Sequence, residues 1–253
     1  MRKPAKSYMI CTTPRSGSTL LCGLLAATGC AGKPDSHFHV PSLPAWLESY
    51  GLIDQTFLTD RDAIGAVVNA AIERGTGDGE FFGLRLQHDS FTFFLSALDT
   101  LTPGCQSDTE MLEAVFGPMT ILYLERYDKL AQAVSLSIAV QSGLWHRNAD
   151  GSERERTAPN RTPSYDRANI QSHLSAVTAQ NAAWRDWFAS QRIAPYRFTY
   201  EDLADAPREV LADTLRILGQ DPEAAANVPI PTAKLADETN AHWAARFRSE
   251  TGS

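Results

Sequence analysis

A segment near the N-terminus, Thr12 to Leu21 with the sequence TTPRSGSTLL, contains the residue types that bind an anion. A glycine-containing turn between a strand and a helix directs backbone N–H groups at one spot, and the positive end of the helix dipole adds to their field. Ser16, Ser18 and Thr19 add hydroxyl donors, and Arg15 adds a fixed positive charge with a planar set of N–H groups. We therefore expect a phosphate or sulfate site here, the alternative being an ordinary serine-rich turn.

The same segment departs from the nucleotide-binding pattern GxxxxGK[ST]. Gly17 and Thr19 fit that pattern, but Thr12 replaces its first glycine and Ser18 replaces its lysine. A cation stands three residues earlier than that lysine, at Arg15, and we identify no acidic residue after an apolar strand that would hold Mg²⁺. The segment therefore lacks the main electrostatic parts of ATP or GTP hydrolysis.

A second pair of residues could contribute to the same anion site. Arg126 directly follows the apolar run MTILYL, and Ser135 lies nine residues later in a helical pattern. An arginine at a strand end and a serine on the next helix could hold one phosphate from two sides. Such a spacing is weak evidence by itself.

Hydrophobic patterning indicates the elements that position these residues. Short apolar runs alternate with segments of helical periodicity, which predicts a three-layer α/β fold with a mostly parallel sheet. The expected strands are Tyr8–Thr12, Glu80–Leu86, Met119–Leu124 and Tyr196–Tyr200, and the expected helices begin near Ser18, Leu43, Thr59, Ser90, Tyr127, Tyr165 and Pro207. The helix that begins at Tyr127 is expected to reach Trp145, and the polar segment 146–163 is expected to be a mobile loop, either a solvated insertion or a lid.

Composition limits the class of protein. A chain of 253 residues, 43% hydrophobic and 21% charged, can form one sizeable core, so we expect a single domain over residues 1–253. The net charge of −7 argues against nucleic acid or an anionic membrane as the main partner. No apolar stretch suits a signal peptide or a membrane span, so a cytoplasmic protein with free cysteines is expected. We find no metal-ligand spacing among the cysteines and histidines.

Taken together, PRSGSTLL and the Arg126–Ser135 pair resemble the sulfotransferases that use 3′-phosphoadenosine 5′-phosphosulfate (PAPS), and most closely the bacterial trehalose 2-sulfotransferase-like family. Further similar motifs follow along almost the whole chain: ATGCAGKPDSHF, FGLRL, AVQSGLW, WRDWF, LGQDP and KLADETNAHWAARFR. The resemblance implies a P-loop-like sulfotransferase fold. It also implies transfer of a sulfuryl group from PAPS, without a metal, to a hydroxyl of a carbohydrate, glycolipid or small metabolite, in a protein that forms a homodimer.

The resemblance also implies roles for single residues. Arg15, Ser16, Gly17, Ser18 and Thr19 would bind the phosphosulfate, and Arg126 and Ser135 would bind the 3′-phosphate. Arg85 stands where members of the family often have a lysine that faces the sulfuryl group. Lys234, Arg246 and Arg248 lie in a region that covers the nucleotide in the family, although a solvated helix face explains the last two equally well.

The general base is where the sequence departs from the family. The related motif GxPxEF has a glutamate that removes the acceptor's proton, and the segment GKPDSHFH has Ser36 at that position. Among the neighbours we favour His37, whose ordinary pKa suits proton abstraction, ahead of Asp35; His39 and His88 are further candidates. Each of these side chains could also be only structural. The two alternative functions are a P-loop-like nucleotide kinase and an inactive nucleotide-binding relative.

Overall fold

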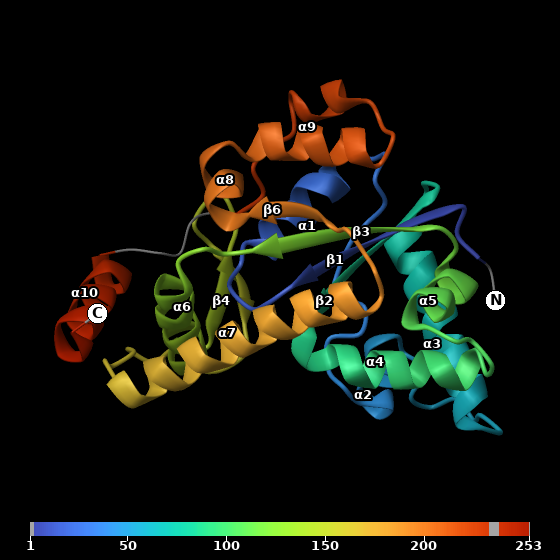
Figure 1. Cartoon of the computed structure of the whole chain (residues 1–253), viewed down its shortest axis with the longest axis horizontal. Coiled ribbons are helices and arrows are strands. Elements are labelled where there is room, and N and C mark those ends of the chain that lie inside the picture. The colour runs from blue at the N-terminus through green and yellow to red at the C-terminus, as the bar shows by residue number, and fades with distance from the viewer. Residues whose placement is uncertain (1–2, 233–237, 253) are drawn as a thin grey trace.

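The computed structural model describes residues 3–232 and 238–252, and its centre is a parallel sheet (Figure 1). The strands are β1 (Lys6–Thr12), β2 (Phe81–Gln87), β3 (Met119–Glu125) and β6 (Tyr196–Thr199), in the order β2-β1-β3-β6. All three pairings are parallel. The chain leaves β1 for β2 on one side and returns to β3 on the other, so the carboxyl end of β1 is a switch point of the kind where α/β sheets bind ligands.

Two hydrophobic clusters cover the two faces of this sheet. Successive residues of β1 alternate between them: Met9 and Cys11 belong to one cluster, and Tyr8 and Ile10 to the other. The first face is covered by α2 (Leu43–Ser49), α3 (Asp60–Thr76), α4 (His88–Leu101), α5 (Asp108–Phe116) and α7 (Arg167–Ser190). The second is covered by α1 (Ser18–Ala27) and α9 (Pro207–Ile217), which lie above the sheet in Figure 1. The predicted three-layer α/β fold is therefore confirmed.

A third hydrophobic cluster packs the C-terminal helix against two earlier helices. Here α6 (Lys129–Ser142) and α7 pack against α10 (Glu238–Thr251), with Trp243 and Phe247 buried between them. The short α8 (Tyr200–Asp205) and a 3₁₀ turn at Pro222–Ala225 complete the helices of the described residues. No helix within residues 3–232 and 238–252 is long and apolar enough to span a bilayer.

The segment after β6 connects the ends of two neighbouring strands. Thr199 caps α8 by accepting a hydrogen bond from the Asp202 N–H at 3.0 Å. The Glu201 carboxylate accepts the backbone N–H groups of Tyr127 and Asp128, at 3.1 and 3.3 Å, at the start of the α6 region. These contacts tie the end of β6 to the end of β3, where Arg126 lies.

Two predictions on secondary structure are wrong. Helix α6 stops at Ser142 because Gly143 takes a left-handed conformation with φ of 71°. The chain then forms an antiparallel hairpin of β4 (Leu144–Arg147) and β5 (Glu153–Arg156), where we expected the end of a helix and an irregular loop. In addition, α5 was not predicted. Its N-terminus is defined by Ser107, which accepts the Glu110 N–H at 3.2 Å.

Replacing the fully buried Trp184 with phenylalanine should destabilise the fold and loosen the end of β1. Its indole N–H donates to the carbonyl of Thr12 at 2.8 Å, and loss of that donor leaves a buried carbonyl without its partner. We expect W184F to lower the free energy of unfolding by about 1–3 kcal/mol in urea titrations. W187F is the matched control, because its indole N–H bonds the less buried Asp108 carboxylate at 2.7 Å, and it should cost clearly less.

Candidate functional site

The anion loop connects β1 to α1 through two residues with positive φ. Arg15 has φ of 63° and Gly17 has φ of 84°, and α1 begins at Ser18. Arginine rarely takes this conformation, so the surrounding contacts must hold it there. The helix N-terminus and the turned backbone place N–H groups on the loop's inner side, which is the geometry expected of an anion site.

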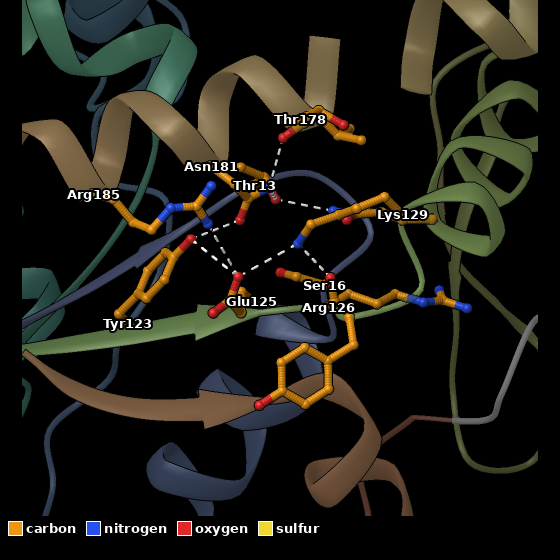
Figure 2. Close-up of polar contacts among 12 residues, drawn as sticks. Thr13, Ser16, Tyr123, Glu125, Arg126, Lys129, Thr178, Asn181 and Arg185 are labelled. Carbon is orange, nitrogen blue, oxygen red and sulfur yellow. Dashed lines mark hydrogen bonds and ion pairs between the residues drawn. The ribbon is translucent and has the colours of Figure 1, made fainter. Parts of the chain in front are cut away.

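Side chains of helices α6 and α7 hold the loop by hydrogen bonds, and Figure 2 shows Asn181 of α7 beside Thr13. The Gln132 amide donates to the Thr13 hydroxyl at 2.9 Å and to the Pro14 carbonyl at 2.6 Å, and the Asn181 amide donates to the same hydroxyl at 3.3 Å. Gln132 and Asn181 are fully buried. Sequence reasoning missed both residues. For Gln132 a signal was available: it is a polar side chain on an otherwise apolar helical face, about one turn before Ser135.

Arg15, Arg126 and Ser135 meet at this loop. The Arg15 Nε–H donates to the Ser135 hydroxyl at 3.1 Å, and the Arg126 guanidinium donates to the Arg15 carbonyl at 3.5 Å. Arg126 also stacks on Tyr200, with its guanidinium carbon 4.3 Å from the ring centre, and its buried Nε has no hydrogen-bond partner among the described residues. Burial, and then the charge of Arg126, lower the pKa of Arg15 to about 10.

These two arginines carry positive charge that the described protein does not balance. Neither forms an ion pair with a carboxylate within residues 3–232 and 238–252. Two neighbouring cations that are largely removed from water are costly unless an anion joins them. The arrangement therefore suits a ligand that brings more than one negative charge.

Arg85 forms the other side of the site, at the end of β2. Its guanidinium donates to the Thr19 hydroxyl at 2.7 Å and to the Ser36 hydroxyl at 2.8 Å, and it lies 3.6 Å from the Asp35 carboxylate. The structure therefore brings together Arg85, Thr19 and the segment that differs from the family motif. Asp35 remains mostly exposed at the rim.

The structure argues against His37 as the base. Its side chain is buried, stacks on Phe82 at a centroid distance of 5.6 Å, and pairs through Nδ1 with the Tyr50 hydroxyl at 2.9 Å. Burial lowers the pKa of His37 to about 4. A histidine enclosed in this way does not reach an acceptor hydroxyl, and the preference for His37 as general base is therefore not supported. His88 packs edge-on against Trp184, and His39 is exposed.

We predicted that no acidic residue after an apolar strand could hold Mg²⁺, and the position of Glu125 requires a correction. It is the last residue of β3, next to β1, which is where a nucleotide kinase could hold Mg²⁺. Figure 2 shows its carboxylate between Lys129, at 3.5 Å, and Arg185, at 3.6 Å. Two cations already satisfy this carboxylate. The described residues also contain no group of three potential metal ligands.

The β4–β5 hairpin closes onto the loop. The Arg15 guanidinium donates to the carbonyl of Trp145 at 2.6 Å, and the His146 Nε2 lies 3.0 Å from the Thr19 hydroxyl. Sequence reasoning missed His146, because nothing in a polar, glycine-containing segment indicates that it folds back onto a turn more than a hundred residues earlier.

The C-terminal cations lie on α10, against α6 and α7. Arg246 pairs with Glu250 at 2.8 Å and stacks on Tyr165, and Arg248 pairs with Asp128 at 3.4 Å. Lys234 lies outside the described residues. The structure therefore places Arg246 and Arg248 in surface pairs.

The family model described as Stf0 sulphotransferase matches residues 7–250. The chain belongs to this family. It is 27% identical to the trehalose 2-sulfotransferase of Mycobacterium tuberculosis, over 99% of this chain and 97% of that protein. It is 26% identical to the trehalose 2-sulfotransferase of Mycolicibacterium smegmatis, over 96% and 95%.

A solved structure supports the fold. The sulfotransferase domain of the Synechococcus PCC 7002 olefin synthase aligns with a TM-score of 0.50, at 17% identity, over 98% of this chain and 96% of that one. At this identity the likeness concerns the fold. Together with the family match, these relatives identify the chain as a sulfotransferase enzyme that performs sulfuryl transfer.

Replacing Gly17 with alanine should weaken the anion site. A Cβ there would lie 2.8 Å from the Tyr200 ring, on which Arg126 stacks, in addition to the strain of a left-handed alanine. G29A is the matched control, because its φ of 73° gives similar strain but its Cβ would meet no atom within 4 Å. We expect G17A to lose about 1 kcal/mol more stability than G29A, and to lose the thermal stabilisation by inorganic sulfate that G29A keeps.

Proposed function

We propose that this sulfotransferase transfers the sulfuryl group of PAPS to a hydroxyl of a carbohydrate. The observation that carries the proposal is the convergence of Arg15, Arg126 and Ser135 on the anion loop, with no carboxylate paired to either arginine in the described residues. PAPS carries a phosphosulfate and a separate 3′-phosphate, so it presents two anionic groups to a site with two such cations. An ordinary nucleoside monophosphate presents only one.

The loop suits the phosphosulfate. The backbone N–H groups of residues 16–19 at the start of α1, the hydroxyls of Ser18 and Thr19, and Arg15 would bind it. Ser16 would contribute mainly its backbone, because its buried hydroxyl is already hydrogen-bonded to Thr12. Gly17 permits the left-handed turn that leads into the helix.

Arg126 and Ser135 suit the 3′-phosphate. In the part of the chain that the structure describes, the buried Nε of Arg126 has no hydrogen-bond partner, and Tyr200 fixes the plane of its guanidinium. The Ser135 hydroxyl accepts from Arg15, so its own proton can be donated to an anion. A phosphate here would link the two arginines and remove the cost of their mutual repulsion.

The reaction needs charge stabilisation more than covalent chemistry. The acceptor oxygen attacks sulfur, the bond from sulfur to the 5′-phosphate oxygen breaks, and 3′,5′-adenosine bisphosphate (PAP) leaves with the electron pair. Arg15 and the loop amides would stabilise charge on the leaving phosphate oxygen, and Arg85 with Thr19 would hold the sulfuryl oxygens. Protein cations can supply this stabilisation, so the proposal requires no metal ion.

Two curated relatives bear the name trehalose 2-sulfotransferase, which supports a carbohydrate acceptor for this chain. The loop that carries Asp35 and Ser36 contacts Arg85 directly, so it lines the space beside the sulfuryl group. Because the sequence of this loop departs from the family motif, its acceptor can differ from trehalose. We therefore propose the substrate class and not one sugar.

Calorimetry with PAP, AMP and Mg-ATP tests the donor. We expect PAP to bind about 10- to 100-fold more tightly than AMP without Mg²⁺, since each charge-assisted hydrogen bond to the 3′-phosphate contributes about 1.5–3 kcal/mol. R126Q should remove the preference for PAP. R216Q, which changes only an exposed arginine paired with Asp213, should keep it.

Equal affinity for PAP and AMP would contradict the proposal. Binding of Mg-ATP alone would favour the nucleotide kinase. Tight PAP binding without any sulfation of hydroxylated compounds would favour an inactive nucleotide-binding relative.

A further inference from the structure

The hairpin of β4 and β5 is anchored directly over the anion loop by adjacent residues. The Trp145 carbonyl accepts from Arg15 at 2.6 Å, and the His146 ring contacts Thr19 at 3.0 Å. Thr19 and Arg15 are residues that the proposed function assigns to the phosphosulfate. The imidazole of His146 therefore lies one hydroxyl away from the sulfuryl position.

We assign to His146 the neutral tautomer whose Nε2 accepts the Thr19 proton. The Thr19 oxygen already accepts from Arg85 at 2.7 Å, so its single proton is free to be donated to His146 Nε2. In the neutral ring, Nε2 then carries the lone pair and Nδ1 carries the hydrogen. The lone pair that a general base needs thus faces the loop.

The charged groups around His146 come from three segments. Arg15 faces it from the loop, Arg85 from β2, and Arg154 from β5, and all three charges disfavour a protonated ring. Glu155, also on β5, places a carboxylate oxygen 3.6 Å from Nε2. Burial, followed by the three arginines, lowers the pKa of His146 to about 3, so the ring is neutral at physiological pH.

We propose that His146 is the general base of this sulfotransferase. The acceptor hydroxyl replaces the Thr19 hydroxyl as the partner of Nε2. Its O–H bond then breaks and its proton moves to Nε2, while the acceptor oxygen bonds to sulfur and PAP departs with the electrons of the broken S–O bond. Glu155 then stabilises the imidazolium, and the proton passes to water after PAP leaves. This inference rests on the proposed function, because it requires a donor at the loop.

Donor binding prepares this base. The 5′-phosphate of the donor offsets the charge of Arg15 and the sulfuryl group offsets that of Arg85, so both raise the pKa of His146 from its low value toward the ordinary histidine range. A neutral ring with a pKa closer to 7 accepts a proton more effectively in the transition state. Proton abstraction is therefore coupled to an occupied donor site.

Asp35 has a different role in this arrangement. Its carboxylate accepts the Ser36 N–H at 2.7 Å and lies 3.6 Å from Arg85, with most of its surface in water. It acts as a counter-ion that positions Arg85. The Ser36 hydroxyl, which accepts from the same guanidinium, supports Arg85 in the same way.

Histidine NMR titration tests the coupling without an identified acceptor. The His146 signals, assigned by their loss in H146Q, should show a neutral ring down to about pH 4 in the free protein. Saturating PAP should raise the pKa of His146 by at least about one unit. A pKa of His146 that PAP leaves unchanged would overturn the coupling between donor binding and proton abstraction.

Kinetics separate His146 from Asp35. With PAPS as donor and trehalose as the acceptor probe, H146Q should lower kcat by about 10²- to 10⁴-fold and abolish the acidic limb of the pH profile. Its PAP affinity should stay within about threefold, which shows an intact fold and donor site. D35N should lower kcat less than tenfold, and H242Q, the same change on the exposed face of α10, should match the unmutated protein.

The outcomes distinguish the two proposals. If PAP binds but H146Q keeps its kcat, or if D35N carries the large loss, His146 is not the base while the donor assignment stands. If the unmutated protein does not bind PAP, the proposed function is wrong, and the inference on His146 is wrong as well because it requires a bound donor. If trehalose is not sulfated, the NMR titration of His146 with PAP tests the proposed coupling by itself.

Discussion

The site depends on two arginines that the fold holds together and that pair with no carboxylate among residues 3–232 and 238–252. The Arg126 guanidinium donates to the Arg15 backbone, and the Arg15 side chain donates to Ser135, so the two cations are fixed on one loop. The neighbouring Glu125, by contrast, is paired with Lys129 and Arg185. The cost of leaving Arg15 and Arg126 unpaired is offset only when an anion binds. This repulsion is the physical basis of the proposal that the loop binds a doubly anionic donor.

The rest of the structure maintains that arrangement. Parallel strands β1, β2 and β3 end at one edge of the sheet, so Arg15, Arg85 and Arg126 come from three segments to one place. Gln132 and Asn181 hold the loop through Thr13 and Pro14, and Tyr200, at the start of α8, stacks on Arg126. Each of these contacts joins residues distant in sequence, which is why the site depends on the whole domain.

Short-range sequence patterns predicted much of the sheet and of the anion loop. The strand, glycine turn and helix around Gly17, and the apolar runs of the sheet, follow from short-range patterns, and the Arg126–Ser135 pair lies on one strand–helix unit. The location of His37 did not follow, because GKPDSHFH does not indicate which side chain enters the core. His146 and the hairpin were also missed, since their position depends on contacts with Arg15 and Thr19 that no local pattern encodes.

The most direct test of the account is a product analysis by mass spectrometry. The protein would be incubated with PAPS, a panel of mono- and disaccharides and EDTA, with Mg-ATP in parallel reactions. The account predicts PAP and a sulfated sugar in equal amounts from PAPS, unaffected by EDTA, and no phosphorylated sugar from ATP. A phosphorylated sugar formed only with Mg-ATP, and no sulfated product from PAPS, would contradict it.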